Sequence, residues 1–156
     1  MMYGCYESPL GPLLLSWEEE ALTGLWMNRE MPEWMYPVPE AVKRWLDDYF
    51  LGKPGGIPFS LKAKGTPFQQ QVWQILLTIP YGQTRTYGDI AREMALLTGK
   101  NKMSAQAIGQ AVGKNPISIL IPCHRCVGAG GKMTGYAGGL ENKVWLLEHE
   151  KKTAGL

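Results

Sequence analysis

The sequence constrains its fold most strongly at Thr66-Pro67-Phe68-Gln69, which has the features of a helix start. Thr66 is a capping residue, Pro67 suits the first helical position, and Gln69 can complete a capping box. An apolar face with helical spacing follows and continues to Leu77, before Pro80-Tyr81-Gly82 ends the pattern. A helix at this position separates a strand-rich beginning of the chain from a helical remainder.

The first 60 residues have the pattern of a small lobe with one sheet and one helix. Turn residues separate three short segments typical of strands, a Pro-rich linker (31–39) follows, and Val42, Trp45, Leu46 and Tyr49 keep helical spacing. Residues 57–64 fit either a strand or a connector. The expected strands are Tyr3–Tyr6, Pro12–Trp17 and Ala21–Met27, and the expected helix is Pro39–Leu51.

Two further helices, over Tyr87–Leu97 after the cap Thr86 and over Ser104–Gly113, are joined by a short connector, as in a helix-turn-helix. Ile90, Met94 and Leu97 form the expected inner stripe of the first. The second is rich in Ala and Gly, so its backbone can approach another surface, or simply another helix, closely. We therefore predict an α/β (α+β) chain with an N-terminal lobe (1–60) and a mainly helical, winged-helix-like C-terminal unit (66–150).

Charge is distributed unevenly along the chain, although the net charge is only +2. Residues 1–60 carry four Lys/Arg against nine Asp/Glu, and residues 85–132 carry seven against two. The basic stretch fits a polyanionic partner or a solvated basic surface.

The three cysteines (Cys5, Cys123 and Cys126) are too few for a disulfide scaffold and favour a reducing, cytoplasmic location. With two His in the chain, a four-ligand zinc site is poorly supported, and we expect no metal. Leu10–Trp17 is too short for a signal peptide or a membrane span. Cys123 and Cys126 have the spacing of a redox dithiol, which is one alternative use of these thiols.

Pro122-Cys123-His124-Arg125 follows the apolar run Ile117–Ile121, which predicts a buried strand. A thiol becomes a good nucleophile when a base or a cation lowers its pKa. Adjacent residues point in different directions in regular structure, so either a tight turn or a water must connect Cys123 to His124. A small buried Cys with a surface His is the alternative.

The last helix is expected over Leu140–Glu150, held to the core by Leu140, Val144 and Leu147. Glu150 would face the negative end of the helix dipole, which is unfavourable by up to ~1 kcal/mol. Pairing with His124 would offset this cost and complete a Cys–His–Glu arrangement; charge balance by Lys151 and Lys152 is the alternative.

Together these residues resemble the O6-alkylguanine-DNA alkyltransferase family, strongly over about residues 66–150. The Pro-Cys-His-Arg element in this setting is highly specific. The other motifs that carry the resemblance are Thr66-Pro67-Phe68, Ile79–Gly82, Thr86–Ala91, Ala111–Pro116, Gly135–Leu140 and Trp145–Glu150.

The resemblance implies that Cys123 takes the alkyl group of O6-alkylguanine irreversibly, once per molecule and without a cofactor. His124, polarised by Glu150, would take the thiol proton through a water. Tyr87 would donate a proton to guanine N3, and Asn115 would tie the recognition helix to the nucleophile.

The resemblance also implies that the partner is double-stranded DNA containing O6-alkylguanine, with the target base flipped out of the helix. The protein is expected to act as a monomer that does not associate with a membrane. Tyr136 and Val112 would flank the base, and backbone groups near Val127 and Ala137 would read its edge. The expected DNA-contacting residues are Thr86, Ala105, Gln106, Ala107, Gln110 and Arg125.

Four positions depart from the family pattern. Gln106 stands where the family usually has an inserted Arg, Ala137 replaces a Ser, and Cys126 and Gln110 replace a more usual Val and Gly. A lesion-binding protein without transfer chemistry, a Cys–His hydrolase and a thiol redox protein are the alternative functions. Retention of Cys123 argues against the first, and the small-residue helix beside a basic stretch argues against the other two.

Overall fold

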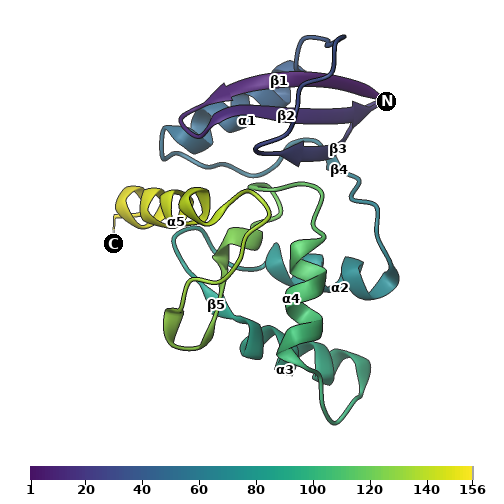
Figure 1. Ribbon diagram of the computed structural model, residues 1–156, viewed down its shortest axis with the longest axis vertical. Helices are drawn as coiled ribbons and strands as arrows, with labels where there is room; N and C mark the ends of the chain where they lie inside the picture. The colour runs from purple at the N-terminus through teal and green to yellow at the C-terminus, as the bar shows by residue number, and fades with distance from the viewer. Residues whose placement is uncertain (156) are drawn as a thin grey trace.

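The computed structural model describes residues 1–155, with a four-stranded sheet and one helix preceding a mainly helical part (Figure 1). The antiparallel strands β1 (Met2–Ser8), β2 (Gly11–Glu18) and β3 (Ala21–Trp26) continue into a short parallel strand, β4 (Ser60–Leu61). The predicted strands and the helix α1 (Glu40–Phe50) are confirmed. Tyr6 of β1 stacks on Phe50 and donates to Asp47, so α1 packs against the sheet.

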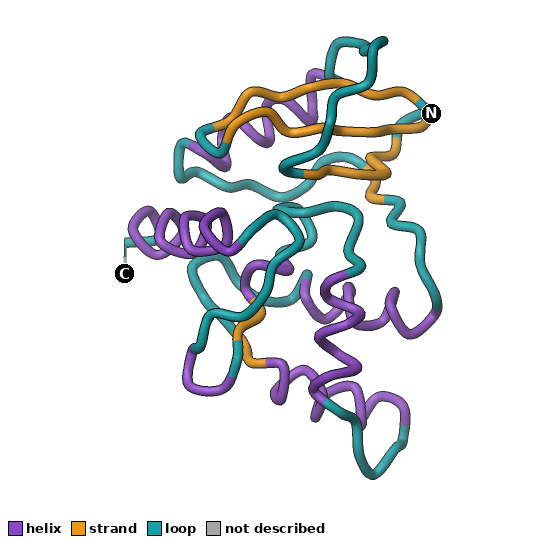
Figure 2. Tube along the Cα trace, viewed as in Figure 1, coloured by secondary structure: helices purple, strands orange, loops and turns teal. Residues whose placement is uncertain are grey.

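The rest of the chain forms the helical part that the sequence predicts, and Figure 2 shows how few strand residues it contains. A two-residue parallel pairing and two 3-10 turns lie between its helices. No helix within residues 1–155 has the length and apolar character needed to cross a membrane. The elements are α2 (Pro67–Leu76), β5 (Arg85–Thr86), α3 (Tyr87–Thr98), α4 (Ala105–Gly113), η1 (Cys123–Arg125), β6 (Cys126–Val127), η2 (Ala129–Gly131) and α5 (Leu140–Thr153).

Side-chain caps fix where α2 and α3 begin. Thr66 and Gln69 exchange hydrogen bonds of 3.2 and 3.0 Å, which is the predicted capping box. Thr86 and Asp89 form a second box at the start of α3. The predicted inner stripe of α3 is wrong at Leu97, which is 62% exposed. This residue lies in the last turn of α3, after the buried Met94.

The apolar run 117–121 is buried, but the prediction that it forms a strand is wrong. Within the described chain, Ile117 alone pairs with the sheet, through a single parallel bridge to Leu25. The chain then turns, with Ile119 in the left-handed region at φ 73°. An apolar run of this length indicates burial but does not discriminate between a strand and a buried turn.

The inner face of α5 also differs from the prediction. Leu140 is 46% exposed, and Val144 and Leu147 are only partly buried. The helix instead buries Lys143 and Glu150, together with Leu146 between them. Both charged side chains have hydrogen-bonding partners in the interior, which offset the cost of burying them.

Trp73 joins α2 to α4, because its ring is 1% exposed and its Nε1–H donates to the carbonyl of Ala111 at 2.9 Å. We expect Trp73→Phe to lower the free energy of unfolding by roughly 2–4 kcal/mol, since it leaves a cavity and removes one of the two hydrogen bonds to the Ala111 carbonyl, which keeps the one from Lys114 N. Urea unfolding measures this loss. Trp34→Phe is the control, because Trp34 is 82% exposed and should change stability by less than about 0.5 kcal/mol. Equal losses would contradict the role of Trp73.

Candidate active site

Glu150 is a buried carboxylate that hydrogen-bonds to three other parts of the chain. Its Oε1 accepts from Gly82 N (3.2 Å) and Arg125 Nε (2.7 Å). Its Oε2 accepts from the Tyr49 hydroxyl (2.6 Å) and Arg125 Nη2 (3.0 Å), and lies 2.6 Å from His124 Nε2. Burial raises the pKa of Glu150, but the hydrogen bonds from His124 and Arg125, together with the Arg125 charge, outweigh it and hold that pKa well below its usual range. Glu150 is therefore ionised, and its position in the last turn of α5 is compensated.

His124 is fully buried and oriented by this carboxylate. Because an ionised carboxylate only accepts hydrogen bonds, Nε2 carries the imidazole proton and Nδ1 keeps a free lone pair. Nδ1 is buried and has no hydrogen-bond partner among residues 1–155. Burial lowers the pKa of His124, and Glu150 only partly opposes this. The ring is therefore a neutral base at neutral pH.

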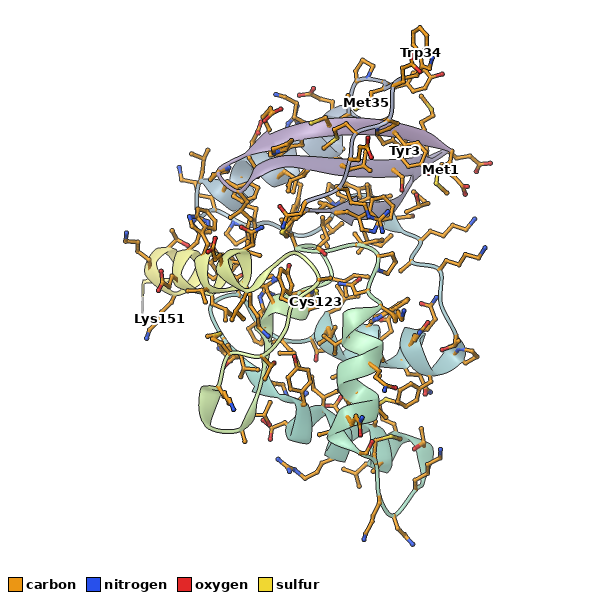
Figure 3. The ribbon with its side chains drawn as sticks, viewed as in Figure 1. Met1, Tyr3, Trp34, Met35, Cys123 and Lys151 are labelled. Atoms are coloured by element: carbon orange, nitrogen blue, oxygen red, sulfur yellow. The ribbon has the colours of Figure 1, made fainter. Side chains whose placement is uncertain are left out.

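Cys123 is 4% exposed and begins the 3-10 turn that also holds His124 (Figure 3). The tight turn after Pro122 was one of the two arrangements expected for this pair. Burial raises the pKa of the Cys123 thiol, while the Asn115 amide, the Tyr136 hydroxyl and the Lys143 ammonium act in the opposite direction. The thiol is protonated at rest and needs a base to become a nucleophile.

Two polar side chains brace the turn around Cys123. Asn115, just after α4, donates to the carbonyl of Ile121 (2.9 Å) and accepts from the N–H of Ile117 (3.0 Å). Lys143 of α5 is fully buried and donates to the carbonyl of Cys126 (2.7 Å). Sequence reasoning missed Lys143, although its spacing of seven residues from Glu150 places both on one helical face.

A cavity of about 640 Å³ separates α4 from the loop after η2. Tyr87 lies on its wall, with its phenol oxygen accepting from Thr134 Oγ1 at 2.9 Å. The Tyr136 hydroxyl is buried and has no partner within the described part of the chain, so a bound group can satisfy it. The lining residues are Tyr87, Ala105, Gln106, Gly109, Gln110, Gly113, Thr134, Gly135, Tyr136 and Ala137.

The cavity brings together many of the residues predicted to contact DNA or the base. Ala107 instead lines a neighbouring groove with Lys100 and Lys114. Val112 and Val127 are buried and do not line the cavity. The Thr86 hydroxyl accepts from Asp89 N and acts as the cap of α3.

Arg125 was expected to contact DNA, but the structure gives it an internal role. Its side chain is 11% exposed and donates to both oxygens of Glu150 and to the carbonyl of Ile79 (2.8 Å). A guanidinium engaged in this way fixes the carboxylate and has little surface left for a phosphate. The positive charge near α4 is then provided by lysines rather than by Arg125. No group of three potential His, Cys, Asp or Glu metal ligands occurs in residues 1–155.

Comparisons with known proteins agree with this geometry. Residues 67–152 match the family described as 6-O-methylguanine DNA methyltransferase, DNA binding domain, and residues 1–63 match its ribonuclease-like domain. The methylated-DNA--protein-cysteine methyltransferase of Methanosarcina acetivorans is 41% identical, with 96% of this chain and 98% of that protein covered. The protein of the same name from Mycobacterium bovis is 44% identical, with 97% and 93% covered.

Among solved structures, the Mycobacterium tuberculosis OGT in complex with DNA matches with a TM-score of 0.85 and 42% identity, over 98% of this chain and 94% of that one. The fold, the arrangement of the buried site and these full-length matches lead to one conclusion: this chain belongs to the 6-O-methylguanine DNA methyltransferase family.

Proposed function

We propose that this protein repairs DNA by transferring an alkyl group from O6 of guanine to the sulfur of its own Cys123. The observation that carries the proposal is the buried thiol beside a neutral His124, whose Nδ1 is free and whose Nε2 is held by Glu150. Tyr136, which acts on the Cys123 thiol, also lines the cavity beside α4. Cys123 itself does not line the cavity, so a base seated there would reach the thiol past Tyr136.

The chemistry is an in-line displacement at carbon. His124 Nδ1 takes the thiol proton through a water, the S–C bond forms, and the C–O6 bond breaks with its electron pair left on guanine. The Tyr87 phenol then gives a proton to guanine N3 and is reprotonated from His124 through solvent. The thiol hydrogen thus ends on guanine, and the thioether remains on the protein after one turnover.

Helix α4 is suited to carry the DNA. Gly109 and Gly113 line the cavity and let a DNA groove approach the backbone closely. Asn115 connects the end of α4 to the turn that carries Cys123, so DNA binding and the nucleophile share one rigid unit. Flipping the target base would cost a few kcal/mol. We assign recognition and transfer to residues 66–150, place the lobe boundary between residues 60 and 66, and expect a cytoplasmic monomer.

A lesion-binding protein without transfer is the alternative, and mass analysis separates the two. After incubation with a duplex containing O6-methylguanine, we expect the intact protein to gain the mass of one methylene group, mapped to the peptide of Cys123. Cys123→Ala should gain nothing while still binding the duplex, and Cys126→Ala should be modified normally. Modification that disappears in Cys126→Ala but persists in Cys123→Ala would show that Cys126, and not Cys123, is the nucleophile. An unmodified wild-type protein that binds the duplex would support the alternative.

Glu150→Gln should slow the single-turnover transfer by roughly 10²-fold, because the neutral amide no longer fixes and polarises His124. Glu148→Gln, an exposed neighbour on α5, is the matched control.

The depressed pKa of Glu150 stabilises the fold above the ordinary carboxyl range, and this contribution is lost as pH falls below it. Urea unfolding should therefore show a smaller acid-induced loss for Glu150→Gln than for wild type. Unchanged transfer and parallel pH profiles would reject this role.

Gln106 is exposed at the cavity, at the position where the family resemblance leads us to expect an Arg. Gln106→Arg should tighten binding to duplex DNA and make the negative slope of log K against log salt steeper by about 0.9 for one added phosphate contact. Binding titrations at several salt concentrations measure both quantities. Gln74→Arg, on the exposed surface of α2, adds the same charge away from the cavity. Identical slopes for the two variants would mean that residue 106 does not reach the DNA.

A further inference from the structure

Tyr49 reaches the active site from the N-terminal lobe. Its ring lies on α1, is fully buried, and its hydroxyl donates to Glu150 Oε2 at 2.6 Å across a sequence separation of 101 residues. Burial and then the Glu150 charge raise the pKa of Tyr49 well above its usual value, so the phenol stays protonated and donates at every working pH.

The hydroxyl shares one carboxylate oxygen with His124. Oε2 meets Tyr49 and His124 at the same distance of 2.6 Å and Arg125 Nη2 at 3.0 Å, whereas Oε1 is bound by Gly82 and Arg125 Nε. Arg125 also supplies the neutralising charge. Four of the five contacts to Glu150 therefore remain without Tyr49, so its hydroxyl is not needed to hold the carboxylate in place.

What the hydroxyl changes is how strongly Glu150 pulls on the imidazole. A donor on Oε2 withdraws electron density from that oxygen and weakens its attraction for the His124 Nε2 proton. A stronger attraction would stabilise the imidazolium, and an imidazolium cannot accept the thiol proton. We infer that Tyr49 is a positioning residue by which the N-terminal lobe keeps His124 a neutral base.

The surroundings make this effect separable from packing. The Tyr49 ring stacks on Trp45 (5.5 Å between centroids) and meets Phe50 and Tyr81 edge-on (5.2 and 5.9 Å), all contacts that Phe retains. Its backbone carbonyl, which bonds His149 Nε2, is also kept. The other charged or titratable groups that act on His124, Glu150 or Tyr49 are Arg125, Lys143 and Tyr81, and they are unchanged in the variant, as is Tyr136, on which Glu150 acts.

The test is Tyr49→Phe in the full chain, with the His124 pKa followed by NMR of a ring-labelled protein. We expect the pKa to rise by about one pH unit, the equivalent of part of a charged hydrogen bond. The acid limb of the single-turnover rate profile should move up by the same amount, with the rate recovered at high pH. Tyr81→Phe is the control. It removes a hydroxyl from the same aromatic cluster, but that hydroxyl bonds Thr153 and not Glu150.

Lower stability with an unmoved His124 pKa and rate profile would show a structural role only and overturn the inference, as would a downward shift. If Tyr49→Phe fails to fold, 3,5-difluorotyrosine placed at position 49 is a stronger donor and should shift the His124 pKa downward; no shift or an upward one overturns the inference. The mechanism rests on the proposed function, but the NMR titration needs no DNA. A shifted pKa without alkyl transfer would therefore count against the proposed function alone.

Discussion

The structure depends on one buried carboxylate. Glu150 carries its charge in the interior because Arg125 neutralises it and because N–H and O–H groups from α1, the turn after α2 and η1 converge on it. An uncompensated charge at this depth would cost several kcal/mol. The same contacts hold the 3-10 turn that carries Cys123 and orient the neighbouring imidazole. Stability and chemistry are therefore coupled through a single side chain.

Capping residues and hydrophobic patterns predict the helices and strands whose limits depend on residues close together in the sequence. The capping residues at Thr66 and Thr86 and the alternating patterns near the N-terminus set their helices and strands within a few residues. The Pro-Cys-His-Arg element and the unfavourable position of Glu150 at a helix end indicate the site from the sequence alone. These predictions needed only neighbours in sequence or a resemblance carried by contiguous motifs.

What sequence reasoning missed depends on distant partners. The run 117–121 forms a turn rather than a strand because it pairs with the sheet at one position, the bridge between Ile117 and Leu25, and not along a length of strand. The helix α5 buries Lys143 and Glu150 because the core supplies their hydrogen-bond partners. Lys143 donates to the carbonyl of Cys126, and Glu150 accepts from the Tyr49 hydroxyl. The sequence pattern places Tyr49 on an apolar helix face, and none of its sequence neighbours indicates that its hydroxyl contacts Glu150. No periodicity in a single helix encodes such partners.

The contact between Tyr49 and Glu150 also orders the folding reaction. Their separation of 101 residues means that the site is complete only after a contact of high sequence separation has formed, which is the kind of contact that slows folding. Until then His124 lacks one of the groups that set its basicity, and the thiol lacks its finished base. The imidazole therefore reaches its native basicity only when the N-terminal lobe and α5 are both in place, so the pH range in which Cys123 can be deprotonated is a property of the whole fold.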